Sequence, residues 1–336
     1  MSAEKITVGL VGCGRAGRGI HMRLLGEHAH LYNVVACADA VPEAAQQLAA
    51  DFGLRALSVE ELIAQPEIEL VVVVTKPPTT HRDVAVPALT AGKHVVVEKP
   101  MANSDAECAE MVAAAQAADR LLAVHHNRRW DVDFLAARQA LTSGCLGELR
   151  LVRNEYVGGF RGSVYDWGIH IIDQSMALSL GKRFVELSAT FCQPNLADPL
   201  ASEGFFTARL RTEEGVLHDI GMLPTFAGNA HRPGRAPVRF MAVGTGGVFF
   251  EDWCQRPEDA FAKMYSQHST DKCQPMGDLP LVEARLAIPD FYDMLYAAIR
   301  EGGPLPVSGE EGRRAVRAWE LICQSATENR TLQIEL

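Results

Sequence analysis

The sequence predicts an α/β protein in two domains: a doubly wound parallel sheet, followed by an antiparallel sheet with helices on one face. The first observation is length, because 336 residues exceed the roughly 100–200 residues of a common single domain. The second is that short β-branched runs alternate with helical stretches over the first 125 residues. The third is that strand-like runs follow one another across turn sequences after about residue 145.

The first domain, residues 1–126, is predicted from strands that alternate with helices. Its β-branched runs are Ile6–Val11, Val34–Ala38, Leu70–Thr75, Val95–Val97 and Leu121–Val124. Its helical stretches include Pro42–Ala50, Arg82–Ala91 and Asp105–Ala118. Ser58 with Glu61, and Ser104 with Glu107, have the spacing of N-terminal capping boxes. Alternation of this kind predicts a parallel sheet that helices cover on both faces.

The second domain, residues 127–336, is predicted from hairpins. Leu149–Val157 is predicted as a long strand, and two turns join further strands: Glu213-Glu214-Gly215 between Phe205–Leu210 and Val216–Met222, and Gly244-Thr245-Gly246-Gly247 between Val238–Val243 and Val248–Glu251. Helices are predicted at Asp133–Thr142, which joins the domains, and at about 309–328, which is free to pack back on the first domain. The stretches 223–237 and 265–280 are predicted as loops.

Composition excludes several classes of protein. A net charge of −10 argues against a nucleic-acid partner, which would require a basic face. The eight cysteines are scattered without a Cys-x-x-Cys pair, which argues against a disulfide scaffold or structural zinc and favours a reducing cytoplasm. No secretory signal and no run of about 18–20 apolar residues is found, so we expect a cytoplasmic protein without a membrane partner.

A glycine-rich turn carries the first functional prediction. Gly12-x-Gly14-x-x-Gly17 directly follows the first strand and opens a helix, which is the context in which this motif binds the pyrophosphate of a dinucleotide. Asp39 ends the second predicted strand, where a carboxylate accepts both ribose hydroxyls and repels a 2′-phosphate. NAD is therefore favoured, and NADP stays open because Ala40 and Val41 offer no steric block.

Two further groups of residues fit acid–base chemistry. Lys99 follows a buried strand, at the sheet edge where ligands bind, although by position alone it could be a solvated lysine. Asp166, His170 and Asp173 have the spacing of one helix face, and an imidazole near a carboxylate is a tunable base. A hydrogen-bonded core histidine is the alternative. No second histidine stands at ligand spacing, so no metal site is predicted.

Together these residues resemble the glucose–fructose oxidoreductase / inositol dehydrogenase / MocA-like (Gfo/Idh/MocA) family over nearly the whole chain. Four landmarks occur in the family's order: Gly12–Gly17, Thr75-Lys76-Pro77-Pro78-x-x-His81, Glu98-Lys99-Pro100, and Asp166-x-Gly168-x-His170-x-x-Asp173. The resemblance implies a Rossmann domain and then an α/β domain with a large, open, mostly antiparallel sheet. It also implies that the substrate lies between the two, and that the open sheet face joins subunits into a homodimer or homotetramer.

The resemblance assigns roles to individual residues. The cofactor contacts that it implies are Gly12, Cys13, Gly14, Arg15, Ala16, Gly17, Asp39, Thr75, Lys76, Pro77, His81, Glu98 and Lys99. Lys99 would touch both nicotinamide and substrate, His170 would serve as acid or base, and Asp166 would orient it. Whether Lys99 or His170 is the base stays open. Asp173, Arg128, Arg161 and Trp167 are the further substrate candidates, with a salt bridge as the alternative for Arg128 and packing for Trp167.

The sequence thus predicts an NAD-dependent oxidoreductase that transfers a hydride between nicotinamide and a hydroxyl carbon of a sugar or cyclic polyol. Two alternatives stay open. One is an NAD-retaining enzyme that cleaves glycosides without net redox change, and the other is a non-catalytic dinucleotide sensor. The family's glycine cluster is shifted here to 158–165, with Arg161 among the glycines, so the identity of the substrate is not predicted.

Overall fold

The structure, a computed structural model, describes residues 4–157, 164–192, 205–223, 240–252, 261–266, 274–280 and 289–336. The chain forms two compact units. The first comprises the residues up to His126 together with Pro289–Val316, and the second comprises 127–288 together with Arg317–Leu336. The chain therefore changes unit at residue 127 and returns to the first unit at Pro289.

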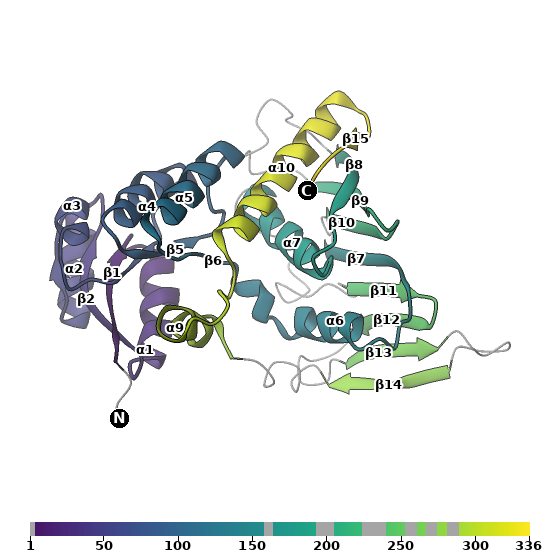
Figure 1. The fold of residues 1–336 in the computed structure, drawn as a ribbon, viewed down its shortest axis with the longest axis horizontal. Coiled ribbons are helices and arrows are strands. Elements are labelled where there is room, and N and C mark those ends of the chain that lie inside the picture. Colours follow the sequence, from purple (N-terminus) through teal and green to yellow (C-terminus); the bar gives the residue numbers. More distant parts are fainter. Residues whose placement is uncertain are drawn as a thin grey trace, which may run out of the picture. The chain divides into compact units, whose positions relative to one another are not determined.

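The first unit contains a six-stranded sheet in the order β3-β2-β1-β4-β5-β6, in which every pair is parallel. The strands are β1 (Ile6–Val11), β2 (Tyr32–Ala38), β3 (Arg55–Ala56), β4 (Leu70–Val73), β5 (His94–Glu98) and β6 (Leu122–His125). The sequence order reverses between β1 and β4, and dinucleotides bind at such a switch point in doubly wound sheets. Figure 1 shows these strands among their helices.

Two helices of the first unit begin at the serine caps that the sequence predicts, Ser58 and Ser104. The helices of this unit are η1 (Gly17–His21), α1 (Met22–Glu27), α2 (Pro42–Phe52), α3 (Val59–Ile63), η2 (Pro78–Thr80), α4 (His81–Thr90) and α5 (Asp105–Ala118), with α9 (Phe291–Glu301) and the start of α10 (Gly309–Glu328). Ser58 and Glu61 form the predicted capping box. At α5 only half of it forms, because Ser104 accepts from the Glu107 amide while the Glu107 carboxylate accepts from Asn103.

The second unit contains a nine-stranded sheet in the order β14-β13-β12-β11-β7-β10-β9-β8-β15, in which only β7 and β10 pair in parallel. The strands are β7 (Leu149–Val157), β8 (Phe184–Cys192), β9 (Phe205–Thr212), β10 (Leu217–Leu223), β11 (Phe240–Gly244), β12 (Gly247–Asp252), β13 (Phe261–Ser266), β14 (Gln274–Pro280) and β15 (Leu332–Gln333). Both predicted hairpins, β9–β10 and β11–β12, are confirmed.

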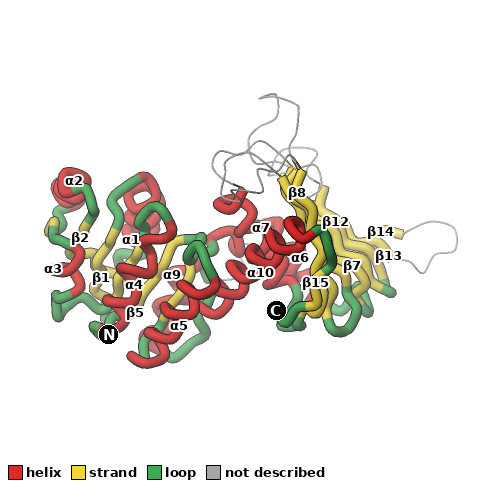
Figure 2. Tube along the Cα trace, turned by 90° about the horizontal axis from the view of Figure 1, so that it is seen from above, coloured by secondary structure: helices red, strands yellow, loops and turns green. Residues whose placement is uncertain are grey.

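Helices of the second unit pack on one face of this sheet, as Figure 2 shows for α6 (Val132–Thr142) and α7 (Val164–Leu178). A short helix, η3 (Asn127–Trp130), precedes α6. Phe134 and Leu141 of α6 join Phe240 and Phe249 of the sheet in the buried core. Buried and more exposed residues therefore alternate along the strands of this sheet, as they do along β9.

One prediction about the second unit changes. The loop predicted at 265–280 is wrong, because Gln274–Pro280 forms the edge strand β14, where proline is tolerated. The outward side chains of β9 and β10 include an ion pair between Arg209 and Asp219. Beyond Leu223, the loop predicted at 223–237 lies outside the described residues, as does Arg161. In the described part of the chain, no helix has the length and apolar character needed to cross a membrane.

Candidate active site

The glycine turn after β1 has the geometry that a pyrophosphate requires. Gly12 has φ +107°, and a Cβ there would lie 2.5 Å from the Val74 carbonyl oxygen. At Gly17, a Cβ would lie 2.0 Å from the Gly12 carbonyl oxygen. Both positions therefore require glycine for the protein's own packing. Gly14 differs, because nothing lies within 4 Å of an added Cβ. Its open side leaves room for the close approach of a phosphate.

Asp39 is held against this turn. Its Oδ2 accepts a hydrogen bond of 2.7 Å from the Cys13 amide, and its Oδ1 accepts one of 2.9 Å from the Val41 amide. Each oxygen keeps a second lone pair, so the carboxylate can still accept ribose hydroxyls. Cys13 therefore positions Asp39 through its backbone, while contact with the Cys37 thiol and burial raise the pKa of its own thiol. Arg15 is exposed and Ala16 is half-buried.

His81 joins the loops that follow β4 and β5. Its Nε2 lies 2.9 Å from the Thr75 carbonyl oxygen, and its Nδ1 lies 3.1 Å from that of Pro100. The ring is buried, and burial lowers its pKa. Both ring nitrogens of His81 face backbone carbonyls, so His81 positions the two loops. Lys76 and Pro77, in the first of these loops, are exposed.

Glu98, the last residue of β5, is a buried anchor for its neighbours. Its Oε1 accepts hydrogen bonds from His21 Nε2 at 2.9 Å and from His125 Nδ1 at 2.8 Å, and its Oε2 accepts one of 3.0 Å from the Lys99 amide. Burial alone would raise the pKa of Glu98, but the bonds from His125 and His21 outweigh it and hold that pKa well below its usual range. Lys99 itself is half-buried at the sheet edge.

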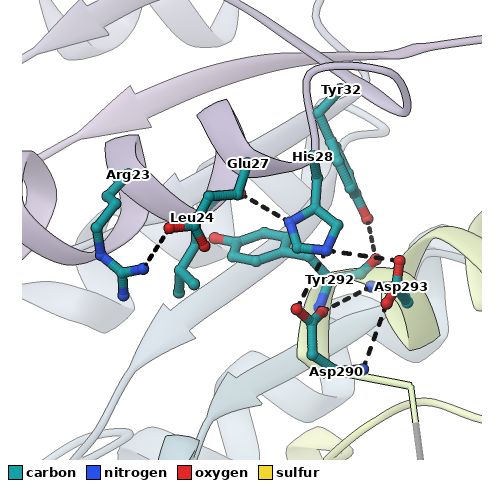
Figure 3. A network of polar contacts seen from close by, with 8 residues as sticks. All are labelled: Arg23, Leu24, Glu27, His28, Tyr32, Asp290, Tyr292 and Asp293. Atoms are coloured by element: carbon teal, nitrogen blue, oxygen red, sulfur yellow. Dashed lines mark hydrogen bonds and ion pairs between the residues drawn. The ribbon is translucent and has the colours of Figure 1, made fainter.

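Helix α9 completes this cluster from the returning segment of the chain. Tyr292 of α9 lies with its hydroxyl 2.7 Å from His21 Nδ1. Figure 3 shows how α9 is held: Asp290 caps it and lies 3.1 Å from His28 Nε2, and the Tyr32 hydroxyl donates to the Tyr292 carbonyl at 2.7 Å. The N-terminal turn of α9 is thereby fixed to α1 and β2.

Two sets of side chains in the described residues have metal-ligating chemistry. The ligand atoms of His21, Glu98 and His125 lie within 4.8 Å of one another, and so do those of His28, Asp290 and Asp293. In the first set, both histidine nitrogens already lie at hydrogen-bond distance from Glu98.

In the second unit, α7 carries the predicted acid–base run. Ile169 and Ile172 are fully buried, as predicted for the apolar face of this helix. His170 is 6% exposed and Asp166 is half-buried. The ring of Trp167, also half-buried, lies 6.2 Å from that of His170 and 5.5 Å from that of Tyr156. An imidazole therefore stands beside an aromatic surface on one helix.

The two arginines of η3 are used differently. Arg129 holds Asp173 in a bidentate pair, with Nε and Nη2 at 2.9 and 2.7 Å from the carboxylate oxygens. Asp173 is 1% exposed and is the buried partner of Arg129. Arg128 lies over the Trp167 ring at 4.9 Å and bonds Asp131 at 3.0 Å. Of the two alternatives for Arg128, the structure shows the salt bridge.

His21, His125 and Tyr292 are the residues that sequence reasoning missed. His125 could have been found, because it pairs with Glu98 at the ends of neighbouring parallel strands, which meet at one sheet edge. His21 lies one helical turn beyond Gly17, on the helix that the glycine motif opens. Nothing in the sequence indicates that Tyr292 returns to them.

Comparison with known proteins shows similarity over the whole chain. The scyllo-inositol 2-dehydrogenase (NADP+) of Bacillus subtilis (strain 168) is 27% identical, with 99% of this chain and 97% of that protein aligned. An inositol 2-dehydrogenase of Rhizobium meliloti (strain 1021) is 27% identical, with 98% and 99% aligned. The crystal structure of an NAD-binding protein from Listeria innocua, 24% identical, has a TM-score of 0.81 over 98% of this chain and 97% of that chain.

Family models match both units. Residues 6–126 match the oxidoreductase family's NAD-binding Rossmann fold, and residues 153–335 match its C-terminal alpha/beta domain. The doubly wound order of the first sheet and the mixed, mostly antiparallel second sheet agree with these two domains. The chain therefore belongs to the glucose–fructose oxidoreductase / inositol dehydrogenase / MocA family of oxidoreductases, with an NAD-binding Rossmann domain at its N-terminus.

Proposed function

We propose that this protein is an NAD-dependent dehydrogenase that oxidises one hydroxyl carbon of a cyclic polyol or sugar. One combination of features carries the proposal. The glycine turn is open at Gly14 and has Asp39 fixed beside it, and Lys99 follows β5, the strand next to β4 at the switch point. The inositol dehydrogenases among its relatives support a polyol substrate.

The proposed roles follow from the chemistry of each side chain. Nicotinamide, when bound, accepts the hydride. Lys99 would hydrogen-bond the reacting hydroxyl and stabilise the developing alkoxide. His170 would exchange a proton with that hydroxyl, and Asp166 would orient the imidazole. Which of Lys99 and His170 is the base is decided by the pH profiles of the two single variants. Trp167 would offer an apolar surface to a sugar ring, and Arg128, stacked on it, a hydrogen-bond donor.

The choice of NAD over NADP rests on Asp39. Its carboxylate is held within the glycine turn by the Cys13 and Val41 amides, so it cannot swing away from the ribose without breaking both bonds. A 2′-phosphate placed there would meet a negative charge. One relative uses NADP+, by its name, so cofactor preference varies within the family.

The test is NADH formation with a panel of inositols, aldoses, anhydrosugars and glycosides, each offered with NAD and with NADP. We expect turnover with a polyol or sugar and NAD, and a loss of at least about a hundredfold in Lys99→Ala. Lys182→Ala, which removes an exposed ion pair with Glu214, is the matched control and should keep full activity. Full turnover of Lys99→Ala would refute the mechanism. Cleavage of glycosides without NADH would favour the redox-neutral alternative.

A further inference from the structure

A buried cluster of hydrogen-bonded side chains contacts the backbone of Lys99. Its centre is Glu98, which is 9% exposed, and its donors are His21, His125 and the Lys99 amide. The two histidines are 0% and 1% exposed. Their rings lie 4.5 Å apart, centroid to centroid. Nothing in the dinucleotide-binding motif requires such a cluster, and the proposed chemistry does not use it directly.

The donor pattern of the cluster is assigned from the ionised Glu98 carboxylate, which can only accept. The Tyr292 hydroxyl donates to His21 Nδ1, which leaves the proton of this ring on Nε2, facing Glu98. Burial, reinforced by His125, lowers the pKa of His21, so this ring is neutral at pH 7. His125 directs Nδ1–H at the same carboxylate oxygen. Both histidines thus donate to Oε1, and Oε2 is left for the Lys99 amide.

We propose that Glu98 is a positioning residue for hydride transfer: its buried carboxylate, held by His21 and His125, fixes the Lys99 amide and thereby the direction in which the lysine side chain leaves the sheet. The inference rests on the proposed function for its kinetic part. Four elements, η1, β5, β6 and α9, contribute side chains to the cluster, so the anchor is tied to the rigid part of the fold.

Such an anchor matters because the lysine amine stands at the end of four rotatable bonds. Those bonds magnify any rotation at the Lys99 backbone into a displacement of the amine. Misplacement by about 1 Å at a reacting centre can cost about a hundredfold in rate. A hydrogen bond from the amide of the same residue to a buried anion is the shortest route by which the fold can limit that rotation, and bonds to ionised acceptors are among the strongest.

The first experiment measures hydrogen exchange at the Lys99 amide, which needs no substrate. We expect faster exchange in Glu98→Gln, and still faster exchange in Glu98→Ala, because an amide cannot present two oxygens and alanine presents none. The matched control is Glu107→Gln, whose carboxylate also accepts a backbone amide, that of Asn103 at 3.0 Å. That variant should leave Lys99 exchange and turnover unchanged. The proposal would be overturned if the Lys99 amide exchanged as slowly in both Glu98 variants as in the wild-type protein.

The second experiment is a double-mutant cycle of Glu98→Gln with Lys99→Ala. We expect Glu98→Gln alone to lower kcat about 10–100-fold, with KM for NAD changed by less than about threefold. In the Lys99→Ala background it should lower kcat no further, because no amine remains to be positioned. Losses that multiply would mean that Glu98 acts by another route, and they would contradict the proposal.

Two further outcomes separate the possible failures. A wild-type protein without dehydrogenase activity counts against the proposed function, whereas the exchange measurement still decides the role of Glu98. Stoichiometric zinc in the purified protein would overturn the proposal, because His21, Glu98 and His125 would then be ligands of the metal and not a hydrogen-bonded anchor.

Discussion

At the scale of single residues, this protein uses acidic side chains to hold backbone amides near functional positions. Asp39 holds the amide of Cys13, and Glu98 holds that of Lys99. In each case the carboxylate lies at the end of a parallel strand, where the sheet presents ligand-binding residues. The two differ in burial: Asp39 is half-buried, whereas Glu98 is 9% exposed. Only the first is therefore placed to meet a ligand itself.

Asp39→Asn tests the basis of cofactor choice. The substitution keeps the shape and one acceptor oxygen but removes the charge that repels a 2′-phosphate. We expect the ratio of kcat/KM for NADP to that for NAD to rise about tenfold, equivalent to about 1.4 kcal/mol. Steady-state kinetics with both cofactors give this ratio. Asp83→Asn, at an exposed carboxylate of α4, is the control. An unchanged ratio would show that Asp39 does not select the cofactor.

At the scale of elements, the spacing of apolar residues and the turn residues between them predict most strands. Two strands, β8 and β14, were missed for physical reasons. β8 was missed because a bulge between Phe184 and Glu186 places Phe184 and Leu187, three residues apart, on the buried side. The alternation that marks a strand is thereby broken. β14 was missed because two prolines and a glycine stand in a strand that lies at the edge of its sheet. Neither β8 nor β14 therefore shows the sequence pattern by which a strand is recognised.

The candidate site was predictable to the same degree. The glycine turn, Asp39, Lys99 and the α7 residues carry motifs that are readable along the chain. The cluster around Glu98 was not, because its side chains come from four elements, and only the pairing of His125 with Glu98 follows from the strand pattern. Similarly, Asp173 could be placed on a helix face, but its bidentate partner Arg129 could not be chosen from spacing alone.

One glycine just before the first helical segment and one within it offer a matched test of the turn. An added Cβ meets nothing within 4 Å at either Gly14 or Gly19. We expect Gly14→Ala to keep its thermal stability but to raise the Kd for NAD at least about tenfold, because the methyl group blocks the backbone's approach to the pyrophosphate. Gly19→Ala should leave both unchanged. Calorimetry and a binding titration measure the two quantities, and equal NAD affinity in the two variants would contradict the assignment.

At the scale of the whole molecule, buried neutral histidines link stability to pH. Burial lowers the pKa of His21 and of His81 below the ordinary 6.5. Below that value the unfolded chain binds protons that the folded chain does not, so unfolding takes up protons and stability falls as pH falls. Each such proton contributes a slope of up to about 1.4 kcal/mol per pH unit. Glu98, with its depressed pKa, adds a further loss only below its ordinary value of 4.5.

We therefore expect the free energy of unfolding to decrease between about pH 6.5 and pH 5. Denaturant titrations across that range, analysed by linkage, count the protons taken up, and we expect more than one. His94→Gln removes a third histidine whose pKa burial lowers, and it should reduce the slope. A flat profile would show that these rings are protonated in the folded state.

The return of the chain to the first unit at Pro289 limits how this protein can be divided. Residues 6–126 match a complete family domain, yet Tyr292 lies in the segment that follows the second unit, and it holds His21. A Cβ at Gly312 of that segment would lie 2.5 Å from Val124, so the fit there is close. A fragment that ends at residue 126 would thus lack residues 289–316 of the cofactor-binding unit. Engineers who wish to transplant it must graft 289–316 as well.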